Sequence, residues 1–534
     1  MERSDVLIYD TTLRDGTQGD QISFSAEDKL RIARRLDDAG IHYIEGGWPG
    51  SNPRDMRFFK MAREVEFKNA RLTAFGSTRK SGLSPDDCPN IGALLEADTP
   101  VVTVFGKSWD LHATQILGVS LDENLSLISD SVAYLKSKGK EVIYDAEHFF
   151  DGYKDNTRYA METIRAALEA GADNIALCDT NGGTLTWEMN EICKDVISLI
   201  SPERLGIHAH NDCGLAVANS LSAVMLGVGM VQGTINGYGE RCGNADLITI
   251  IGNLDLKMDK KCLPESSIRS LAGLSRYVND IANIPPLKSK PFVGNNAFAH
   301  KGGVHVSAVL KNPRAYEHID PELVGNRRRV VVSDLSGKSN IEYKAKELGV
   351  DLGTGSDMSN KIVRDIKKME DEGYQFDAAD GSLSLLMRRA IGTFMEPFSL
   401  ESFRVIDEKT GNRSSHSQSM IKISVGEEYE ITAAEGKGPV NALDNALRKA
   451  LIKFYPRISE MHLVDFKVRI LEGSDGTAAK VRVLLESRDD SEEWTTIGVS
   501  ENIIEASWYA LIDSMQYKLS RDSETENVQE GTDI

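Results

Sequence analysis

Residues 6–18 read VLIYDTTLRDGTQ, and this stretch sets the pattern for the first half of the chain. Its first part, VLIYD, is a short apolar run with the length and composition of a buried β-strand. Its second part, TTLRDGTQ, is polar and follows without a linker. A strand that ends in charged and hydroxyl side chains is typical of enzymes with parallel strands, where chemistry occurs at the C-terminal ends.

Seven further runs of this kind follow before residue 260. They are IHYIEGG (41–47), RLTAFGS (71–77), VVTVFGK (101–107), EVIYDAE (141–147), NIALCDT (174–180), RLGIHAH (204–210) and MVQGTIN (230–236), and successive starts lie 26 to 40 residues apart. The intervening segments, such as SAEDKLRIARRLDDAG (25–40), have the polar start, 3.6-residue spacing and glycine stop of helices. Eight β-α units in about 250 residues predict a closed (β/α)₈ TIM barrel. An open doubly wound sheet is the alternative.

Polar residues gather at the C-terminal ends of most of these runs. The ends read DTTLRDGTQ, EGGWPG, DAEH, DTNGG, HAHND and NGYGERCGN. In a TIM barrel these ends meet at one rim, which carries the active site. The repeated placement therefore favours the barrel and predicts a single reaction centre.

The pattern His-x-His in RLGIHAH places two imidazoles on one face of a strand. His208 and His210 are two residues apart, and strand side chains alternate between faces. Two imidazoles with a carboxylate indicate a divalent-metal site, whereas a hydrogen-bonded pair of strand histidines is the structural alternative. Asp15 and Asn244 are candidates to complete the site, because strands one and eight are neighbours in a closed barrel.

Other rim residues have roles that the pattern alone leaves open. Arg14 would stabilise an oxyanion beside a metal-bound ketone, or would form a structural salt bridge across the barrel mouth. Glu147 and Thr180 end runs five and six and are also consistent with loop capping. The glycines of NGYGERCGN (236–244) lack the spacing of a dinucleotide-binding fingerprint, so we expect a tight loop near the metal.

The composition argues against several classes of function. A net charge of −19 disfavours non-specific binding to nucleic acids or to anionic membranes. The six cysteines form no C-x-x-C pair, and the N-terminus has no apolar signal region. We therefore expect a cytoplasmic enzyme without membrane or nucleic-acid partners.

These segments together resemble the α-isopropylmalate, homocitrate and citramalate synthase family. DTTLRDGTQ is similar to the family's first signature, HAHNDCGLAVANSLSAVMLG to its second, and NGYGERCGNADL to the loop with its last metal-associated residue. The resemblance implies a Mg²⁺ or Mn²⁺ site made of Asp15, His208, His210 and Asn244.

The same resemblance implies roles for the remaining rim residues. Arg14 is expected to be catalytic and to contact substrate, Thr180 to hold the carboxylate of a 2-oxo acid, and Glu147 to lie near the reacting carbons. Two segments depart from the family: EGGWPG (45–50) stands where EAGFP is usual, and Tyr144-Asp145-Ala146-Glu147 where Phe-Ser-x-Glu is more usual. We expect Tyr144 to bind substrate. Chains with EGGWPGSNPRD resemble the citramalate-forming branch, which implies pyruvate as the acceptor.

Residues 264–395 are expected to form a connector that follows a barrel domain at 1–263. HKGGVHVSAVLKNPRAYEHIDPELVGNRR (300–328) is similar to the family's subdomain that covers the barrel mouth, often that of a partner subunit. This implies a catalytic role for His305 and also for Tyr316, which stands where the family has a tyrosine near that histidine. His305 paired with Glu147 would abstract a proton from the acetyl methyl group. Lys301 stands where the family commonly has Glu, which affects the orientation of His305.

Residues 396–520 indicate a duplicated β-β-β-α unit. Glu430 and Trp494 begin corresponding strands, 64 residues apart. EGKGPVNALDNAL resembles the family's regulatory domain, which binds the end-product amino acid at a dimer interface. This implies a homodimer or higher homo-oligomer with isoleucine as effector; a dimerisation domain that has lost its effector is the alternative. The polar residues 521–534 are expected to be a disordered tail.

The predicted activity is therefore an acyl transfer in which the acetyl group of acetyl-CoA becomes an alkyl group on pyruvate, the first step of a threonine-independent route to isoleucine. The same condensation with 2-oxoisovalerate, leading to leucine, is the near alternative. A metal-dependent retro-Claisen lyase is a more distant one, because such lyases usually end soon after the barrel. An amino-acid sensor with an inactive barrel is disfavoured, since the metal and catalytic positions are all present.

Overall fold

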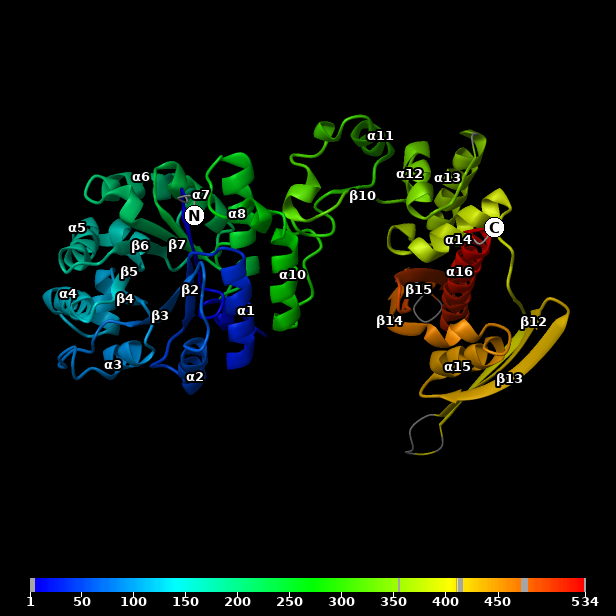
Figure 1. Ribbon diagram of the computed structural model, residues 1–534, viewed down its shortest axis with the longest axis horizontal. Helices are drawn as coiled ribbons and strands as arrows, with labels where there is room; N and C mark the ends of the chain where they lie inside the picture. The colour runs from blue at the N-terminus through cyan, green and yellow to red at the C-terminus, as the bar shows by residue number, and fades with distance from the viewer. Residues whose placement is uncertain (1–4, 354–355, 410, 412–415, 472–478, 533–534) are drawn as a thin grey trace. The chain divides into compact units, whose positions relative to one another are not determined.

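The computed structural model describes residues 5–353, 356–409, 411, 416–471 and 479–532 (Figure 1). The chain forms two compact units. The first comprises residues 1–298 and 319–327, and the second comprises residues 299–318 and 328–534. Each unit has its own hydrophobic core and is described separately.

The first unit is built on a closed barrel of eight parallel strands in chain order, with β1 paired to β8. The strands are β1 (Leu7–Asp10), β2 (Tyr43–Gly47), β3 (Arg71–Ser77), β4 (Val101–Lys107), β5 (Glu141–Glu147), β6 (Asn174–Asp179), β7 (Leu205–Ala209) and β8 (Met230–Gly233). Each lies within one of the eight predicted runs. The TIM barrel is therefore confirmed, and the open sheet is excluded.

Helices that follow the strands form the outer layer of the barrel, as Figure 1 shows. They are α1 (Ala26–Asp38), α2 (Pro53–Ala62), α3 (Pro89–Glu96), α4 (Leu121–Ser137), α5 (Phe149–Glu169), α6 (Thr186–Ile197), α7 (Ala216–Met225) and α8 (Leu247–Lys257). The start of α1 illustrates their local origin, because Ser25 and Asp28 form a reciprocal capping box there.

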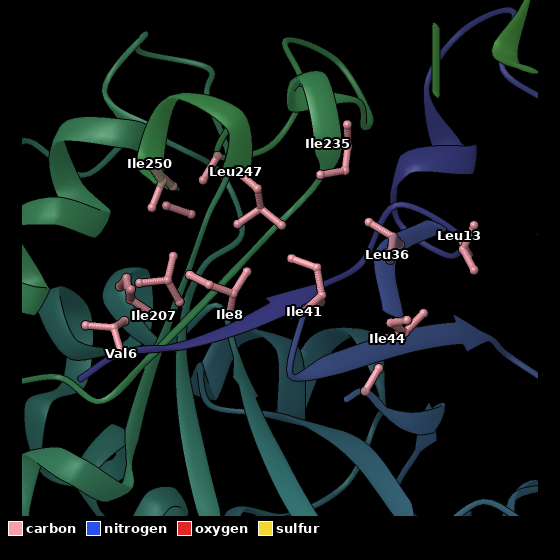
Figure 2. Close-up of a cluster of buried hydrophobic side chains, with 14 of the residues drawn as sticks. Val6, Ile8, Leu13, Leu36, Ile41, Ile44, Ile207, Ile235, Leu247 and Ile250 are labelled. Carbon is pink, nitrogen blue, oxygen red and sulfur yellow. The ribbon is translucent and has the colours of Figure 1, made fainter. Parts of the chain in front are cut away.

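Alternation along the strands separates two cores. Outward side chains such as Ile8 pack between strands and helices, and Figure 2 shows Ile8 and Ile207 beneath Leu247 and Ile250 of α8. The next residue, Tyr9, instead points inward and packs with the inward side chains Tyr43, Val101, Ile143 and Met230. This inner cluster fills the barrel.

Two more helices complete the first unit, α9 (Glu265–Ile268) and α10 (Leu271–Ala282). Asn236, just after β8, donates hydrogen bonds from its side-chain amide to the Ser275 carbonyl and to Asn279 Oδ1, each at 3.0 Å. Because α10 is held by the barrel in this way, the compact unit continues beyond the boundary expected at residue 263.

The second unit begins with a small parallel pair, β9 (Ala299–His300) and β10 (Arg329–Val330). Its helices before the duplicated region are α11 (Gly303–Lys311), α12 (Lys338–Glu347), α13 (Ser356–Asp371) and α14 (Asp380–Ile391). Short helical turns in the two units are η1 (Gly16–Gln18), η2 (His112–Ile116), η3 (Pro202–Arg204), η4 (Ile235–Gly237), η5 (Pro313–Ala315), η6 (Pro321–Val324), η7 (Phe376–Ala378) and η8 (Pro456–Glu460).

The duplicated β-β-β-α unit is confirmed. The first copy is β11 (Ser399–Glu408), β12 (His416–Val425), β13 (Glu428–Gly436) and α15 (Pro439–Leu451); the second is β14 (His462–Ile470), β15 (Val481–Arg488), β16 (Glu493–Ser500) and α16 (Ile503–Thr532). Both sheets are antiparallel. The copies share a detailed contact: Thr432 donates to the Ala446 carbonyl, and Thr496 to the Ala510 carbonyl, each at 2.7 Å.

The two copies differ in what covers their sheets. One face of each sheet packs against its own helix, α15 or α16. The second face of the β14–β16 sheet is also covered, because Leu484 and Ile497 pack with α13 and α14. The second face of the β11–β13 sheet exposes a row of apolar side chains, namely Ile406, Met420, Tyr429 and Ile431.

The C-terminus differs from its prediction. Residues 521–532 continue α16, whereas the sequence predicted a disordered tail, and residues 533–534 lie outside the described residues. The start of this segment is anchored: Lys518 Nζ lies 3.1 Å from Asp489, and Arg521 Nη1 lies 2.7 Å from Glu492 in the turn between β15 and β16. Among the described residues, no helix combines the length and apolar character needed to cross a bilayer.

Candidate active site

Asp15, His208 and His210 meet at the rim of the barrel. Asp15 follows β1, His208 lies in β7, and His210 follows β7. His208 Nε2 lies 3.1 Å from Asp15 Oδ2 and 3.3 Å from His210 Nε2. All three side chains are buried, and one potential ligand atom from each lies within 4.8 Å of the others. The structure thus brings together three predicted ligand residues that are far apart in the chain.

Asn244 joins this cluster. Its Nδ2 donates to Asp15 Oδ2 at 2.7 Å, while its Oδ1 is buried and has no hydrogen-bond partner among the described residues. His210 Nδ1 is likewise buried without such a partner. The backbone of Gly239 passes so close to Asn244 that a Cβ at this position would overlap Asn244 Oδ1. The glycine-rich loop therefore packs closely against Asn244 and holds its side chain beside the cluster. This agrees with the tight loop that the sequence predicted.

These donors fit a divalent cation. A carboxylate, two imidazoles and an amide oxygen are ligands that such ions take in proteins, and rotation of the Asn244 amide would bring its oxygen to the place of its nitrogen. Unpartnered buried polar atoms are costly unless a partner is supplied. The buried cluster is therefore a metal-site arrangement by its chemistry.

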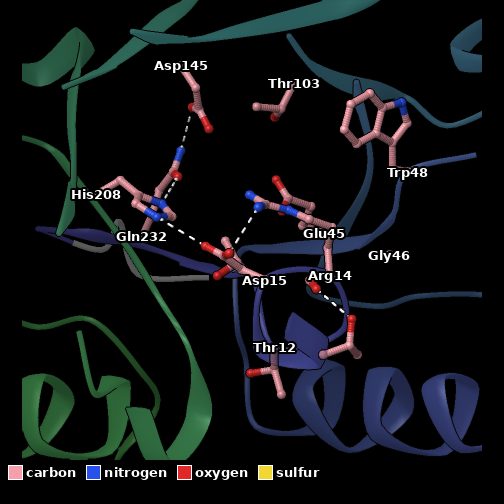
Figure 3. Close-up of polar contacts among 12 residues, drawn as sticks. Thr12, Arg14, Asp15, Glu45, Gly46, Trp48, Thr103, Asp145, His208 and Gln232 are labelled. Atoms are coloured by element: carbon pink, nitrogen blue, oxygen red, sulfur yellow. Dashed lines mark hydrogen bonds and ion pairs between the residues drawn. The ribbon is translucent and has the colours of Figure 1, made fainter. Parts of the chain in front are cut away.

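Arg14 is held between two carboxylates (Figure 3). Its Nε donates to Glu45 Oε1 at 2.5 Å, and its Nη1 lies 3.1 Å from Asp15 Oδ1. The guanidinium also lies over the Phe75 ring, 3.8 Å from the centroid. Burial by itself would raise the pKa of Asp15, but the Arg14 and His208 charges outweigh it and hold this pKa well below its usual range. The site thus fixes an ionised carboxylate beside a fixed cation.

A second buried network lies behind His208. Gln232 Oε1, from β8, accepts a hydrogen bond from His208 Nδ1 at 2.8 Å, and Gln232 Nε2 donates one to Asp145 Oδ1 at 3.0 Å (Figure 3). Burial raises the pKa of Asp145 to about 7, and the nearby Glu45 charge adds to the shift. One pocket therefore holds two carboxyl groups, on Asp15 and Asp145, whose pKa values are shifted in opposite directions.

The cluster opens into a cavity of about 180 Å³. Its polar end carries Arg14, Asp15 and the two histidines. Its other end is aromatic: the Trp48 ring packs edge-on against Phe75 and Phe105, with centroids 5.9 and 5.4 Å apart. The remaining lining residues are Gln18, Asp145, Glu147, Cys178, Thr180, Glu240 and Arg241. The cavity has the size of a small metabolite.

Glu147 and Thr180 line this cavity, as predicted from their places at strand ends. Glu147 forms an ion pair with Lys107 from the end of the neighbouring strand β4. Thr180 Oγ1 accepts a hydrogen bond from the His148 backbone N–H at 2.9 Å, which leaves the Thr180 hydroxyl proton available to a further acceptor.

The prediction for Tyr144 requires correction. Tyr144 is fully buried in the layer between strands and helices and does not line the cavity. Its neighbour Asp145 lines the cavity instead, because side chains alternate along β5 and Asp145 shares its face with Glu147. The same alternation, applied to Glu147 in the sequence, would have identified Asp145.

His305 and Tyr316 belong to the second unit. His305 lies in α11, and the two rings stack with centroids 4.2 Å apart and an interplanar angle of 30°. The structure therefore brings these two residues together. The pairing of His305 with Glu147, which belongs to the first unit, stays a prediction.

Glu45 and Gln232 are site residues that the sequence analysis missed. Glu45 is fully buried, binds Arg14 and accepts a hydrogen bond from the Tyr9 hydroxyl at 2.6 Å. It was quoted only as part of EGGWPG. Gln232 sits within a run that was interpreted as a plain strand. A charged or amide residue inside an apolar strand was the available signal, because such a group is buried only when it is paired.

A parallel barrel with a buried Asp–His–His–Asn cluster and a paired Arg at its rim defines a class of metal-dependent enzymes acting on small molecules. Residues 5–275 match the HMGL-like family, residues 292–374 the homocitrate synthase post-HMGL domain-like family, and residues 377–519 the LeuA allosteric (dimerisation) domain. The chain belongs to the HMGL-like family.

Relatives with assigned activities are similar over nearly the whole chain. An (R)-citramalate synthase of Geobacter sulfurreducens is 55% identical, over 98% of this chain and 99% of that protein. One of Aquifex aeolicus is 54% identical, over 97% of this chain and 98% of that protein. A probable 2-isopropylmalate synthase of Methanopyrus kandleri is 33% identical, over 95% and 97%. The similarity thus spans the barrel, the connector and the duplicated region alike.

Proposed function

We propose that this chain is an (R)-citramalate synthase, which joins the acetyl group of acetyl-CoA to pyruvate and hydrolyses the thioester to release CoA. The observation that carries the proposal is the 55% identity to an (R)-citramalate synthase over 98% of the chain. The 33% identity to a probable 2-isopropylmalate synthase is far lower, although the matched length is similar. This difference favours pyruvate over 2-oxoisovalerate as the acceptor.

The metal proposed for the buried cluster is Mg²⁺ or Mn²⁺, held by Asp15, His208, His210 and Asn244. When bound, such an ion polarises the ketone of a chelating 2-oxo acid as a Lewis acid. Asp15 is suited to this role because its carboxylate stays ionised beside Arg14. The burial of all four side chains keeps bulk water from competing for the donors.

Arg14 is proposed to stabilise the negative charge that develops on the ketone oxygen. Two carboxylates and a ring face hold the guanidinium before substrate arrives, so little reorganisation is needed during the reaction. Burial would lower the pKa of Arg14, but Asp15 and Glu45 outweigh it and keep the side chain cationic. Thr180, whose hydroxyl proton is available to an acceptor, is proposed to hold the substrate carboxylate.

Proton removal from the acetyl methyl group is proposed for His305 with Glu147, assisted by Tyr316. The stacked rings of His305 and Tyr316 fix their mutual orientation. The Glu147 side chain, which forms an ion pair with Lys107, would stabilise the protonated imidazole that results. The carbanion that forms attacks the ketone carbon, and water then cleaves the thioester.

The match to the LeuA allosteric (dimerisation) domain supports a regulated homo-oligomer. We propose a homodimer, with the exposed apolar face of the β11–β13 sheet as a contact surface, and isoleucine as the inhibitor. Isoleucine added to the full-length enzyme should reduce activity more than leucine does.

The activity is tested by CoA release from acetyl-CoA with a panel of 2-oxo acids. Pyruvate should give the highest kcat/KM, and 2-oxoisovalerate a much lower one. A preference for 2-oxoisovalerate would instead identify an isopropylmalate-forming enzyme. CoA release that needs no 2-oxo acid at all would reject the condensation.

A further inference from the structure

Gln232 connects the metal-site cluster to Asp145. Its side chain is fully buried in β8 and is not among the described residues that line the barrel cavity, so it does not contact substrate bound there. From its geometry we infer that Gln232 is a positioning residue: it fixes the proton of His208 on Nδ1 and so presents the Nε2 lone pair to the metal, while Asp145 fixes the orientation of the Gln232 amide. The inference rests on the metal site of the proposed function.

The backbone register places these groups in line. His208 and Gln232 are direct partners in the parallel pairing of β7 with β8. Asp145 comes from β5, two strands beyond β7, and reaches Gln232 across the barrel interior. The two hydrogen bonds, of 2.8 and 3.0 Å, use one side of the amide each. Gln232 is therefore held at both ends.

The polarity of the amide follows from Asp145. A carboxylate oxygen accepts hydrogen bonds, so the group that faces Asp145 Oδ1 must be the NH₂ of Gln232. The oxygen of Gln232 then faces His208 Nδ1, and an oxygen can only accept. His208 must therefore donate from Nδ1, which places the lone pair of its neutral ring on Nε2. Protonation of Asp145 on Oδ2 would leave Oδ1 free to accept and would keep this order.

The Nε2 atom of His208, which would carry the lone pair when a metal is bound, lies among the other cluster residues. Nε2 lies 3.1 Å from Asp15 Oδ2 and 3.3 Å from Asn244 Nδ2, inside the cluster. His210 has no comparable support, since its Nδ1 lacks a partner among the described residues. Of the two histidines, Gln232 therefore orients only His208. Outer partners that fix a histidine ligand typically change metal affinity by about 10- to 100-fold when removed.

The decisive measurement is Mn²⁺ binding to chelator-treated full-length protein, followed by electron paramagnetic resonance of the free ion. Gln232→Met keeps the length and removes both hydrogen bonds. We expect its Mn²⁺ dissociation constant to rise about 10- to 100-fold. The Mn²⁺ concentration for half-maximal CoA release should rise in parallel, with kcat at saturating Mn²⁺ less affected.

The matched control is Asn219→Leu, which removes a different buried amide from the same unit. Asn219 of α7 donates to the Thr184 carbonyl at 2.8 Å and accepts from the Thr186 hydroxyl at 2.8 Å, and neither partner belongs to the metal cluster. This variant should melt at a lower temperature and bind Mn²⁺ as the wild type does. A merely structural role of Gln232 would give the same result for Gln232→Met.

A second pair of variants tests the hydrogen bond between Gln232 and Asp145. Asp145→Asn keeps an oxygen that can accept from Gln232 and should hold the Mn²⁺ affinity within about threefold, whereas Asp145→Leu should weaken it about tenfold. If both Gln232→Met and Asp145→Leu bound Mn²⁺ with wild-type affinity, the inference about Gln232 would be wrong, while the proposed metal site would stand. Failure of the wild type to bind Mn²⁺ would overturn the metal site as well. Mn²⁺ binding needs no substrate, so an error in the proposed acceptor leaves the result intact.

Discussion

The cavity at the barrel mouth has two unlike ends. At one end, Asp15, His208 and Arg14 are buried in ion pairs and hydrogen bonds. Trp48, Phe75 and Phe105 form an aromatic wall that offers few polar groups, and it borders the charged end where the Arg14 guanidinium lies over the Phe75 ring. The charged end is assembled from β1, β7 and the loop after β8, while the aromatic wall comes from β3, β4 and the end of β2.

This division separates two properties of the enzyme. Fixed charges at one end stabilise the charge that develops during reaction, and this determines the reaction class. An apolar wall discriminates between substrates only by size and shape, and one methylene is worth about 1–3 kcal/mol. We therefore expect substitutions at the charged end to abolish turnover and substitutions at the aromatic end to alter the choice of acceptor.

The largest effect is expected at the metal cluster. His208→Ala, or chelation of the wild type, should lower kcat at least about 10³-fold, because the metal contributes several kcal/mol to the transition state. Mn²⁺ should restore the chelated wild type and leave the variant inactive. His416→Ala is the control, since His416 lies in β12 of the second unit, is half exposed and pairs with Glu435. Full metal-free activity in steady-state assays would remove the Lewis-acid role.

Arg14→Lys should lower kcat by about 10²- to 10³-fold, the range for loss of an oriented donor to an oxyanion. A lysine ammonium cannot reproduce the guanidinium fork that meets Glu45 and Asp15 together. The same change in Arg79, which pairs with Asp130 outside the cavity, should leave kcat unaltered. Equal losses in both variants would mean that Arg14 acts only in folding.

Trp48→Ala should alter the choice of acceptor more than the rate of turnover. Space opened beside Phe75 and Phe105 should raise the kcat/KM ratio of 2-oxoisovalerate to pyruvate by about 10- to 100-fold. Turnover of the better substrate should fall much less than in Arg14→Lys. Trp187→Ala, at an exposed position on α6, serves as the control. An unchanged ratio would show that the wall does not select the acceptor.

The smallest effect concerns stability and pH. Burial raises the pKa of Asp145 to about 7, so between pH 4 and 7 the folded state holds a proton that the unfolded state has released. This contribution stabilises the protein at low pH and is lost as the pH rises through 7. Relative to Asp145→Asn, the wild type should lose about 1 kcal/mol of unfolding free energy per pH unit between pH 5 and 6. Denaturant unfolding that gives the same free-energy difference between the wild type and Asp145→Asn at pH 5 and at pH 6 would contradict this prediction.

Most of the barrel was predictable because its signals are local and repeated. Each strand required only a short apolar run, and each helix a polar start and a glycine stop, so eight independent segments pointed to one topology. His208 and His210 were found for the same reason, since two-residue alternation is a property of any strand. Asp15 and Asn244 followed from the neighbourhood of strands one and eight in a closed barrel.

Contacts across the barrel were harder to infer. Gln232 and Glu45 are significant only through partners on other strands, and their own segments look like ordinary strands. Tyr144 was predicted to bind substrate because it lies in the strand-five segment that departs from the family pattern, yet alternation turns it to the outer face. Arg521, the first residue of the predicted tail, pairs with Glu492, a partner 29 residues earlier in the chain, and composition alone does not reveal such a contact.

The uncovered face of the β11–β13 sheet bears on how the protein reaches its working form in the cell. A single copy would display Met420, Tyr429 and Ile431 to water, each about half exposed or more. If that face closes against a second copy, the measured stability must depend on protein concentration. Newly made chains at low abundance would then be the most vulnerable to proteases and to chaperone capture, and expression level would become a determinant of lifetime.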